Sequence, residues 1–223
     1  MDCAAAGPAV SDLIDDYQDF VVIEYHVNDP PYATPWGDAR AVDFYDIFSG
    51  FLPWFGFDGL FNAGYDWLNY EPQLQQRLTV TTDVTLTISG VEDAADTYDI
   101  TAEVCVEVGG VGKTMRLYIA QLLDNYPPTE LYYRNSFMQA APTEDVILAA
   151  GQCAQVVRTF TFGADSMAQI EDVKIVAWAQ EPLDFYPAEV HQAIESPWPF
   201  IGPAIFSDGF ESGGLAGWSG TNP

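Results

Sequence analysis

A cysteine stands at the start of the first helix that this sequence predicts. Cys3 precedes a run with helical character that extends through Tyr17. A thiol at a helix N-terminus has a lowered pKa, because unpaired N–H groups and the helix dipole stabilise the thiolate. Ala6 stands three residues further on, so the chain offers no second thiol there to resolve a mixed disulfide. Any redox chemistry at Cys3 is therefore expected to be monothiol chemistry; the alternatives are an inert thiol or pairing with a cysteine upstream of Met1.

The other two cysteines lie on predicted strands. Cys105 belongs to the period-two run 99–108, and it falls on the face opposite the apolar side chains. Cys153 opens a similar run at 153–162. Two cysteines on the polar faces of neighbouring strands could form a disulfide, which suits an oxidising compartment. The alternative is two unrelated free thiols.

Four carboxylates are concentrated in eight residues between two predicted strands. They belong to Glu92, Asp93, Asp96 and Asp99. Calcium takes several oxygen ligands from acidic loops of this kind, although the spacing matches no EF-hand. The sequence therefore offers these residues as calcium candidates, with a solvated loop as the alternative, and it predicts no other cofactor.

Two further motifs carry less chemistry. His26 and Cys3 together supply too few ligands to bind copper or zinc tightly. The run from Gly109 to Thr114 resembles a phosphate-binding loop, but Glu107 stands where that motif needs its first glycine. We interpret this run as a hairpin loop.

Composition limits the classes of partner. The 223 residues include 33 acidic and 7 basic side chains, a net charge of −26. Such a chain repels nucleic acid and anionic headgroups, and no apolar run is long enough to span a bilayer. Hydrophobic residues make up 48% of the chain, enough for a packed core.

The elements expected around Cys3 resemble the thioredoxin-like fold. They are the helix that follows the cysteine, a buried strand at 20–26, a helix at 38–48 and a hairpin that turns at Asp58-Gly59. The resemblance covers residues 1–75. Since thioredoxin-like folds place a central strand before this cysteine, we expect either residues upstream of Met1, which could include a leader, or a strand supplied from elsewhere.

The resemblance also assigns roles to single residues. Pro53 stands at the family's cis-proline position, where it would pack against Cys3, and Ala6 replaces the second cysteine of the redox motif. The resemblance therefore implies a thioredoxin-like domain whose redox motif is degenerate.

From residue 76 to residue 182 the sequence pattern is that of repeated strands, with turns about every ten residues. This pattern predicts an antiparallel β-sandwich. The expected strands lie at 77–88, 99–108, 114–123, 145–149, 153–162 and 173–180. The fold class is thus α/β plus all-β. Residues 183–223 are expected to form a proline-rich linker and a flexible tail.

The tail at 205–219 resembles the Asp-Gly-Phe-Glu-Ser-Gly tails of many exported bacterial proteins. With the thioredoxin-like segment, it implies similarity to the outer membrane protein 28-related family and a location outside the cell, on its surface or in the periplasm. We expect a binding or surface-assembly module with a protein partner or self-assembly. The alternatives are a monothiol oxidoreductase that uses Cys3 and a subunit of a filament or surface layer.

An aromatic surplus supports an interface. It extends through the region of the predicted hairpin and exceeds what one face of a small sheet needs. Its members are Phe51, Trp54, Phe55, Phe57, Phe61, Tyr65 and Trp67.

Overall fold

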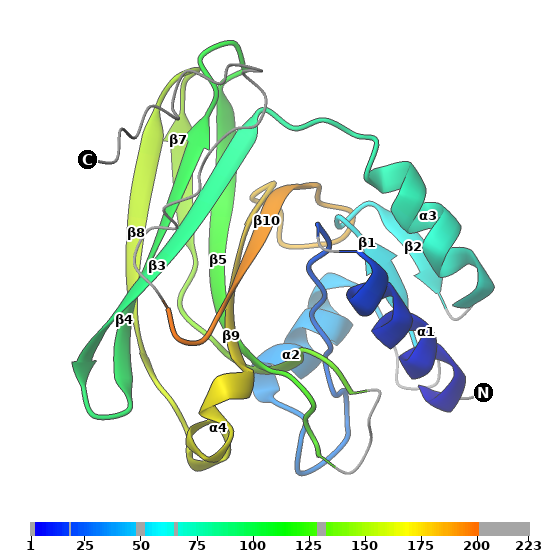
Figure 1. The fold of residues 1–223 in the computed structure, drawn as a ribbon. Helices are drawn as coiled ribbons and strands as arrows, with labels where there is room; N and C mark the ends of the chain where they lie inside the picture. Colours follow the sequence, from blue (N-terminus) through cyan, green and yellow to red (C-terminus); the bar gives the residue numbers. More distant parts are fainter. Residues whose placement is uncertain (1–2, 18, 48–51, 65–66, 129–132, 201–223) are drawn as a thin grey trace, which may run out of the picture.

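The computed structural model describes residues 3–17, 19–47, 52–64, 67–128 and 133–200. Two antiparallel sheets pack face to face, and a layer of short helices with a small hairpin covers the outer face of the larger sheet (Figure 1). The architecture is therefore mixed: a β-sandwich with a helical layer on one side.

The smaller sheet has three strands in the order β3-β4-β8. Their bounds are Val84–Ala94 for β3, Thr97–Val106 for β4 and Cys153–Thr161 for β8. On β4 the alternate residues Ile100, Ala102 and Val104 are fully buried against the other sheet. The period-two pattern read from the sequence thus faces the sandwich core.

The larger sheet has five strands. The order is β10-β9-β5-β6, and β7 pairs with the first half of β5. Their bounds are Lys113–Leu123 for β5, Ser136–Ala140 for β6, Glu144–Leu148 for β7, Val173–Gln180 for β9 and Val190–Pro197 for β10. A short helix, α4, and a 3-10 turn, η4, connect β8 to β9 at Ala164–Ala168 and Ile170–Asp172.

Both faces of β9 are buried. Ile175 and Ala177 point into the sandwich core, while Val176 and Trp178 face the N-terminal layer. A strand covered on both sides needs an almost continuous apolar run, and this explains why Val173–Gln180 is so hydrophobic.

The N-terminal layer consists of short elements with a small core of their own. The elements are α1 (Cys3–Asp16), α2 (Pro35–Ala39), η1 (Arg40–Phe44), β1 (Phe55–Phe57), β2 (Phe61–Gly64), η3 (Trp67–Asn69) and α3 (Tyr70–Arg77). Their shared core is formed by Ala6, Leu13, Phe57, Tyr70 and Leu74. Phe20 and Phe55 pack against this core from its edge.

The β1–β2 turn docks this layer onto the large sheet. Asp58 and Gly59 both have positive φ, as an Asp-Gly hairpin turn requires. The Gly59 carbonyl accepts a hydrogen bond from the Ala188 amide at 3.0 Å. A Cβ on Gly59 would lie 1.9 Å from the Ala188 carbonyl oxygen, so only glycine permits this approach.

The run at 20–26 forms no regular strand. Only Glu24 pairs, through a single parallel bridge to Ser136 at the edge of β6. Val21, Ile23 and Tyr25 nevertheless pack on the outer face of the large sheet. The expected strand at 20–26 is therefore wrong, because these side chains pack on the sheet while the backbone forms no ladder with it.

Three other expectations need correction. The run 77–88 is not one strand, because α3 continues to Arg77 and β3 begins only at Val84. The loop at 109–112 is not a hairpin, since it carries the chain from β4 in one sheet to β5 in the other. Residues 190–197, expected as part of a linker, form strand β10.

The expected domain boundary at 75/76 falls inside α3. The tail at 205–219, and Phe51 and Tyr65 among the hairpin aromatics, lie outside the described residues. Within the described chain no helix is long and apolar enough to cross a membrane.

Candidate functional site

The sequence-predicted thiol site is only partly described. Cys3 is the first residue of α1, as expected, but its side chain lies outside the described part of the structure. Ala6 is buried, and it lines a cavity that Pro53 also lines. The Leu52–Pro53 peptide bond is cis. Monothiol chemistry at Cys3 stays a prediction.

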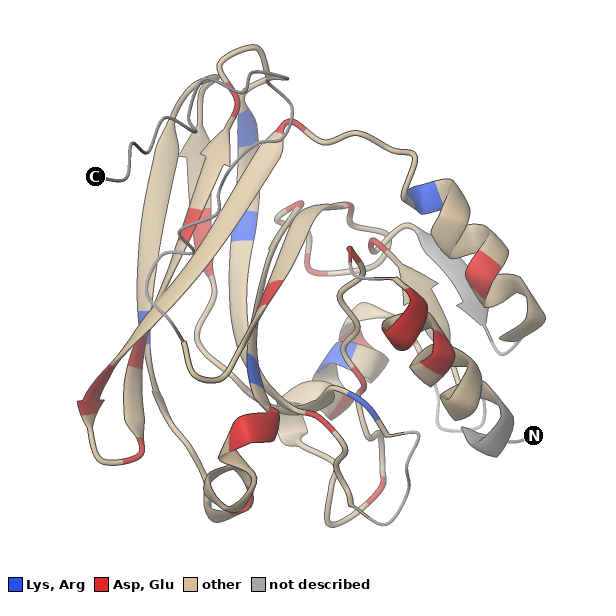
Figure 2. Ribbon diagram, viewed as in Figure 1, with Lys and Arg blue, Asp and Glu red and all other residues tan. Residues whose placement is uncertain are grey.

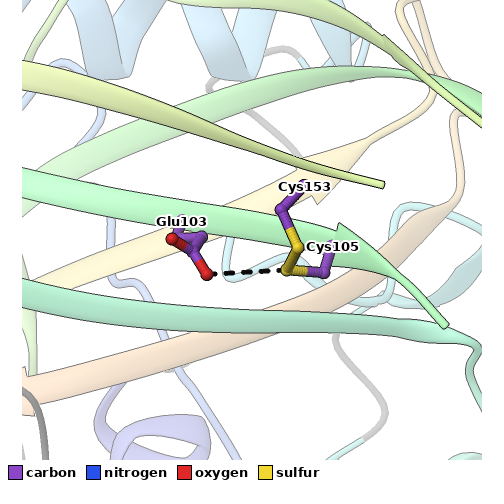
Figure 3. Close-up of side chains that lie close together, drawn as sticks. All are labelled: Glu103, Cys105 and Cys153. Carbon is purple, nitrogen blue, oxygen red and sulfur yellow. Dashed lines mark hydrogen bonds between the residues drawn. A yellow bond between two sulfur atoms is a disulfide. The ribbon is translucent and has the colours of Figure 1, made fainter. Parts of the chain in front are cut away.

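Cys105 and Cys153 form a disulfide (Figure 3). They stand opposite each other on β4 and β8, with their Cα atoms 4.0 Å apart. Glu103 Oε1 lies 3.6 Å from Cys105 Sγ. These three residues are the one group within the described chain that brings three metal-binding side chains together. Because the two sulfurs are bonded to each other, neither is a thiolate ligand.

The acidic residues expected to bind calcium lie on a tight hairpin. Glu92 and Asp93 belong to the end of β3, Asp96 to the turn and Asp99 to β4. Asp99 accepts a hydrogen bond from Thr159 Oγ1 at 2.6 Å. No three of these carboxylates form a compact metal-binding group in the described structure. Calcium binding here stays a prediction.

A cavity of about 830 Å³ lies between the N-terminal layer and the outer face of the large sheet. Its wall includes apolar and aromatic side chains from both layers, among them Tyr25, Tyr45, Trp54, Val176 and Trp178. The volume is that of a typical small-molecule site.

The basic residues of the chain concentrate around this cavity. Asp and Glu are spread over both layers, whereas Lys and Arg are few (Figure 2). Four of the seven Lys and Arg residues line the cavity: Arg40, Arg77, Lys113 and Arg134.

Three of these four cations have carboxylate partners within 2.7 Å. The ion pairs are Arg77–Asp58, Lys113–Asp83 and Arg134–Asp124. These pairs cancel most of the positive charge around the cavity.

Arg40 differs from the other three. It leaves η1 with only 7% of its surface exposed, and its partners are neutral: Gln180 Oε1 accepts from Nη2 at 2.6 Å and the Tyr118 hydroxyl from Nη1 at 3.3 Å. Nε is buried and has no partner among the described residues. The guanidinium carbon lies 3.6 Å from the centre of the Phe44 ring.

α2 and η1 position Arg40. The Thr34 hydroxyl caps α2 by accepting a hydrogen bond from the Gly37 amide at 3.0 Å, and Pro35 starts the helix. Trp36 then stacks on Phe137 of β6, with the ring centres 4.8 Å apart. The helix is thereby held on the sheet with Arg40 directed at Gln180 of β9.

A half-buried carboxyl, that of Glu24, also lines the cavity. Burial raises the pKa of Glu24 to about 8, and a hydrogen bond from the Arg134 amide only partly offsets this. At neutral pH Glu24 is therefore predominantly protonated, and the cavity carries one negative charge fewer than its composition indicates.

His26 stands between an aspartate and a serine. Nδ1 lies 3.2 Å from Asp29 Oδ2 and Nε2 lies 3.1 Å from Ser136 Oγ. This triad-like order was not visible in the sequence. Ser136 is buried and its hydroxyl donates to the Tyr126 carbonyl, so the serine is no nucleophile and accepts from Nε2 instead. Both ring nitrogens of His26 thus lie within hydrogen-bond distance of neighbouring side chains.

Reasoning from the sequence missed Arg40, Glu24 and the cavity. One signal was present: Arg40 is the only Lys or Arg before Arg77. His191 also lines the cavity, and burial lowers its pKa.

Fold and site together define a two-part protein with a ligand-sized cavity between a helical layer and a β-sandwich. Among solved structures, HBP35 of Porphyromonas gingivalis has a similar fold: the TM-score is 0.66 at 14% identity, over 90% of this chain and 71% of that one. This likeness shows a shared fold.

Two other solved structures are less similar. A domain of the outer membrane lipoprotein Omp28 from Porphyromonas gingivalis has a TM-score of 0.34 at 12% identity, over 53% of this chain and 89% of that one. A β-glucosidase from Kluyveromyces marxianus reaches 0.31 at 13% identity, over 52% of this chain and 14% of that one. Likenesses this weak carry no argument. No protein-family model and no curated protein matches the chain.

Proposed function

We propose that this protein is a non-catalytic binding module that holds a small ligand in the cavity between its two parts. The observation that carries the proposal is the cavity itself, about 830 Å³ in volume and lined from both layers. A cavity of this volume whose wall combines apolar and aromatic side chains with polar groups has the form of a ligand site.

The N-terminal layer is proposed to be a degenerate thioredoxin-like domain. Its support is the order of elements: α1, a packed extended segment at 20–26, α2 with η1, the β1–β2 hairpin, and α3. Ala6 replaces the second cysteine, so this layer serves to shape one wall of the cavity.

Export is the proposed location. The Cys105–Cys153 disulfide supports it, because such bonds persist in oxidising compartments and are rare in the cytosol. The resemblance of the tail to those of exported proteins points the same way. A periplasmic or surface setting would expose the cavity to extracellular small molecules.

A neutral fluorescent probe tests whether the cavity binds. N-phenyl-1-naphthylamine is expected to bind in a saturable manner and to gain fluorescence. Ala193→Phe adds a ring at the cavity wall contributed by β10 and is expected to weaken binding at least tenfold. Val157→Phe, on an exposed position of β8 away from the cavity, is the matched control.

Two results would contradict the proposed binding function. One is no saturable binding of the probe by the folded protein. The other is equal binding by the wild type and by a folded Ala193→Phe variant, since the probe would then lie elsewhere.

A further inference from the structure

Arg40 is a buried cation without a counter-charge. Its surface is 7% exposed, and no carboxylate of the described residues pairs with it. Burying an uncompensated charge costs several kcal/mol, and neutral acceptors recover only part of that. In a chain with 33 acidic and 7 basic residues, an internal carboxylate partner would be easy to supply.

The surroundings hold the guanidinium in a fixed geometry. Gln180 is fully buried and donates from Nε2 to the Ala188 carbonyl at 2.8 Å, which directs its Oε1 towards Arg40. Tyr118 stacks on Trp178 with ring centres 4.6 Å apart and planes nearly parallel. The guanidinium has five N–H donors, and two of them have hydrogen-bond partners among the described residues.

The environment around Arg40 is desolvated and aromatic. Burial raises the pKa of Tyr25 well above its ordinary value, although the Arg40 charge acts in the opposite direction. The ring centres of Tyr45 and Tyr118 lie 5.2 and 5.0 Å from the guanidinium carbon. In such surroundings a charge-assisted hydrogen bond is strong.

The charged side chains that line the cavity limit the net charge that a ligand can carry. The other three cations are already paired, and Glu24 is predominantly neutral at neutral pH. Arg40 is the one cation of the described wall without a carboxylate partner, while Asp19, Asp29, Asp58, Asp83 and Glu189 line the same cavity and would repel a second negative charge. Arg40 can therefore hold one anionic group, whereas the carboxylates of the wall disfavour further negative charge on the ligand.

We propose that Arg40 binds the carboxylate of a small organic monoanion whose apolar or aromatic body occupies the cavity. The proposal rests on the proposed binding function and names its ligand class. A planar guanidinium matches a carboxylate in shape, and the aromatic wall supplies the contact for the rest of the molecule. A dianionic phosphate fits less well because the cavity supplies one unpaired cation.

The test compares two probes of the same shape by isothermal titration calorimetry on the full chain. 2-Naphthoate carries the carboxylate, and 2-naphthamide is its neutral counterpart. The wild type is expected to prefer 2-naphthoate by about 10- to 100-fold, the range for one hydrogen-bonded charge. Arg40→Gln keeps hydrogen-bonding groups but removes the charge, and it is expected to abolish the preference.

Arg158→Gln is the matched control. Arg158 lies on β8 and pairs with Glu144, outside the cavity wall, so its removal changes the net charge equally. The preference should survive in this variant.

Several outcomes would overturn the inference. Equal affinity of the wild type for the two probes would do so, and this arm stands even if Arg40→Gln fails to fold. Tighter binding of 2-naphthyl phosphate than of 2-naphthoate would replace the carboxylate by a phosphate. If N-phenyl-1-naphthylamine binds but 2-naphthoate is not preferred, the ligand class fails while the binding function stands.

Discussion

Removing the Cys105–Cys153 disulfide is expected to destabilise the protein substantially. The two cysteines are 48 residues apart, and the loop they close contains β5, β6 and β7 of the opposite sheet. Closing a loop of that length in the unfolded chain corresponds to about 4 kcal/mol of stabilisation in the chain-entropy model. For a protein of this size, this is a fall in Tm of about 8–16 °C.

The measurement is urea unfolding of Cys105→Ser/Cys153→Ser in a Cys3→Ser background, against the Cys3→Ser variant alone. Removing Cys3 from both prevents new pairings. Adding reductant to the control should lower its stability towards that of the triple variant. A thiol count on the denatured, unreduced wild type should find one free thiol, because two of its three cysteines are joined. Three free thiols, or a loss of stability below about 1 kcal/mol, would refute the reasoning.

Substitutions of Glu24 and Asp124, two carboxyls with shifted pKa values, should have opposite pH dependences. Because the pKa of Glu24 is raised, the folded state keeps a proton that the unfolded state releases. The contribution of Glu24 to the free energy of unfolding therefore decreases as the pH rises from about 4.5 to about 8. Glu24→Gln should therefore gain stability over the wild type by a few kcal/mol at pH 9 and little at pH 5; an equal difference at both would contradict this. Burial alone would raise the pKa of Asp124, but the Arg134 hydrogen bond and the Lys174 charge hold it below its usual value, so its stabilisation is present above that value and is lost as the pH falls. Asp124→Asn should cost roughly 2–4 kcal/mol at pH 7 and less at pH 3, as measured by urea unfolding, and a cost independent of pH would rule out the charge as its cause.

Period-two patterns predicted the sandwich where strands bury a whole face. β4 alternates because one face meets the opposite sheet, and its polar face carries Cys105 opposite Cys153. β9 is apolar throughout because both its faces are covered. In both strands the local sequence reports the packing directly.

Strands β6 and β10 gave no such signal. The residues of β10, Val190–Pro197, alternate little in polarity, and every one but the last is half-buried. β10 is an edge strand beside the cavity, so neither of its faces is fully buried or fully exposed. The segment at 20–26 failed in the opposite way, since a clean strand pattern packs on the sheet but pairs with it only at Glu24.

The environment of Arg40 was invisible locally because it is built from distant positions. Gln180 lies 140 residues away along the chain and Tyr118 lies 78 residues away. A helical pattern around position 40 shows only an amphipathic element. The sequence did show that basic residues are scarce in this part of the chain, since Arg40 is the only Lys or Arg before Arg77.

The comparison of Arg40 with Arg134 is the strongest reason to assign Arg40 a ligand. Arg134 lines the same cavity, and the fold gives it Asp124 at 2.7 Å and Asp15 at 2.9 Å. If Arg40 served only to hold η1 against the sheet, an apolar side chain stacked on Phe44 would do so without the cost of desolvating a charge. Its rigid setting, its neutral partners and its place on the cavity wall instead fit a group that acquires its counter-charge from outside the chain. The loss of carboxylate preference in Arg40→Gln is the result on which this distinction depends.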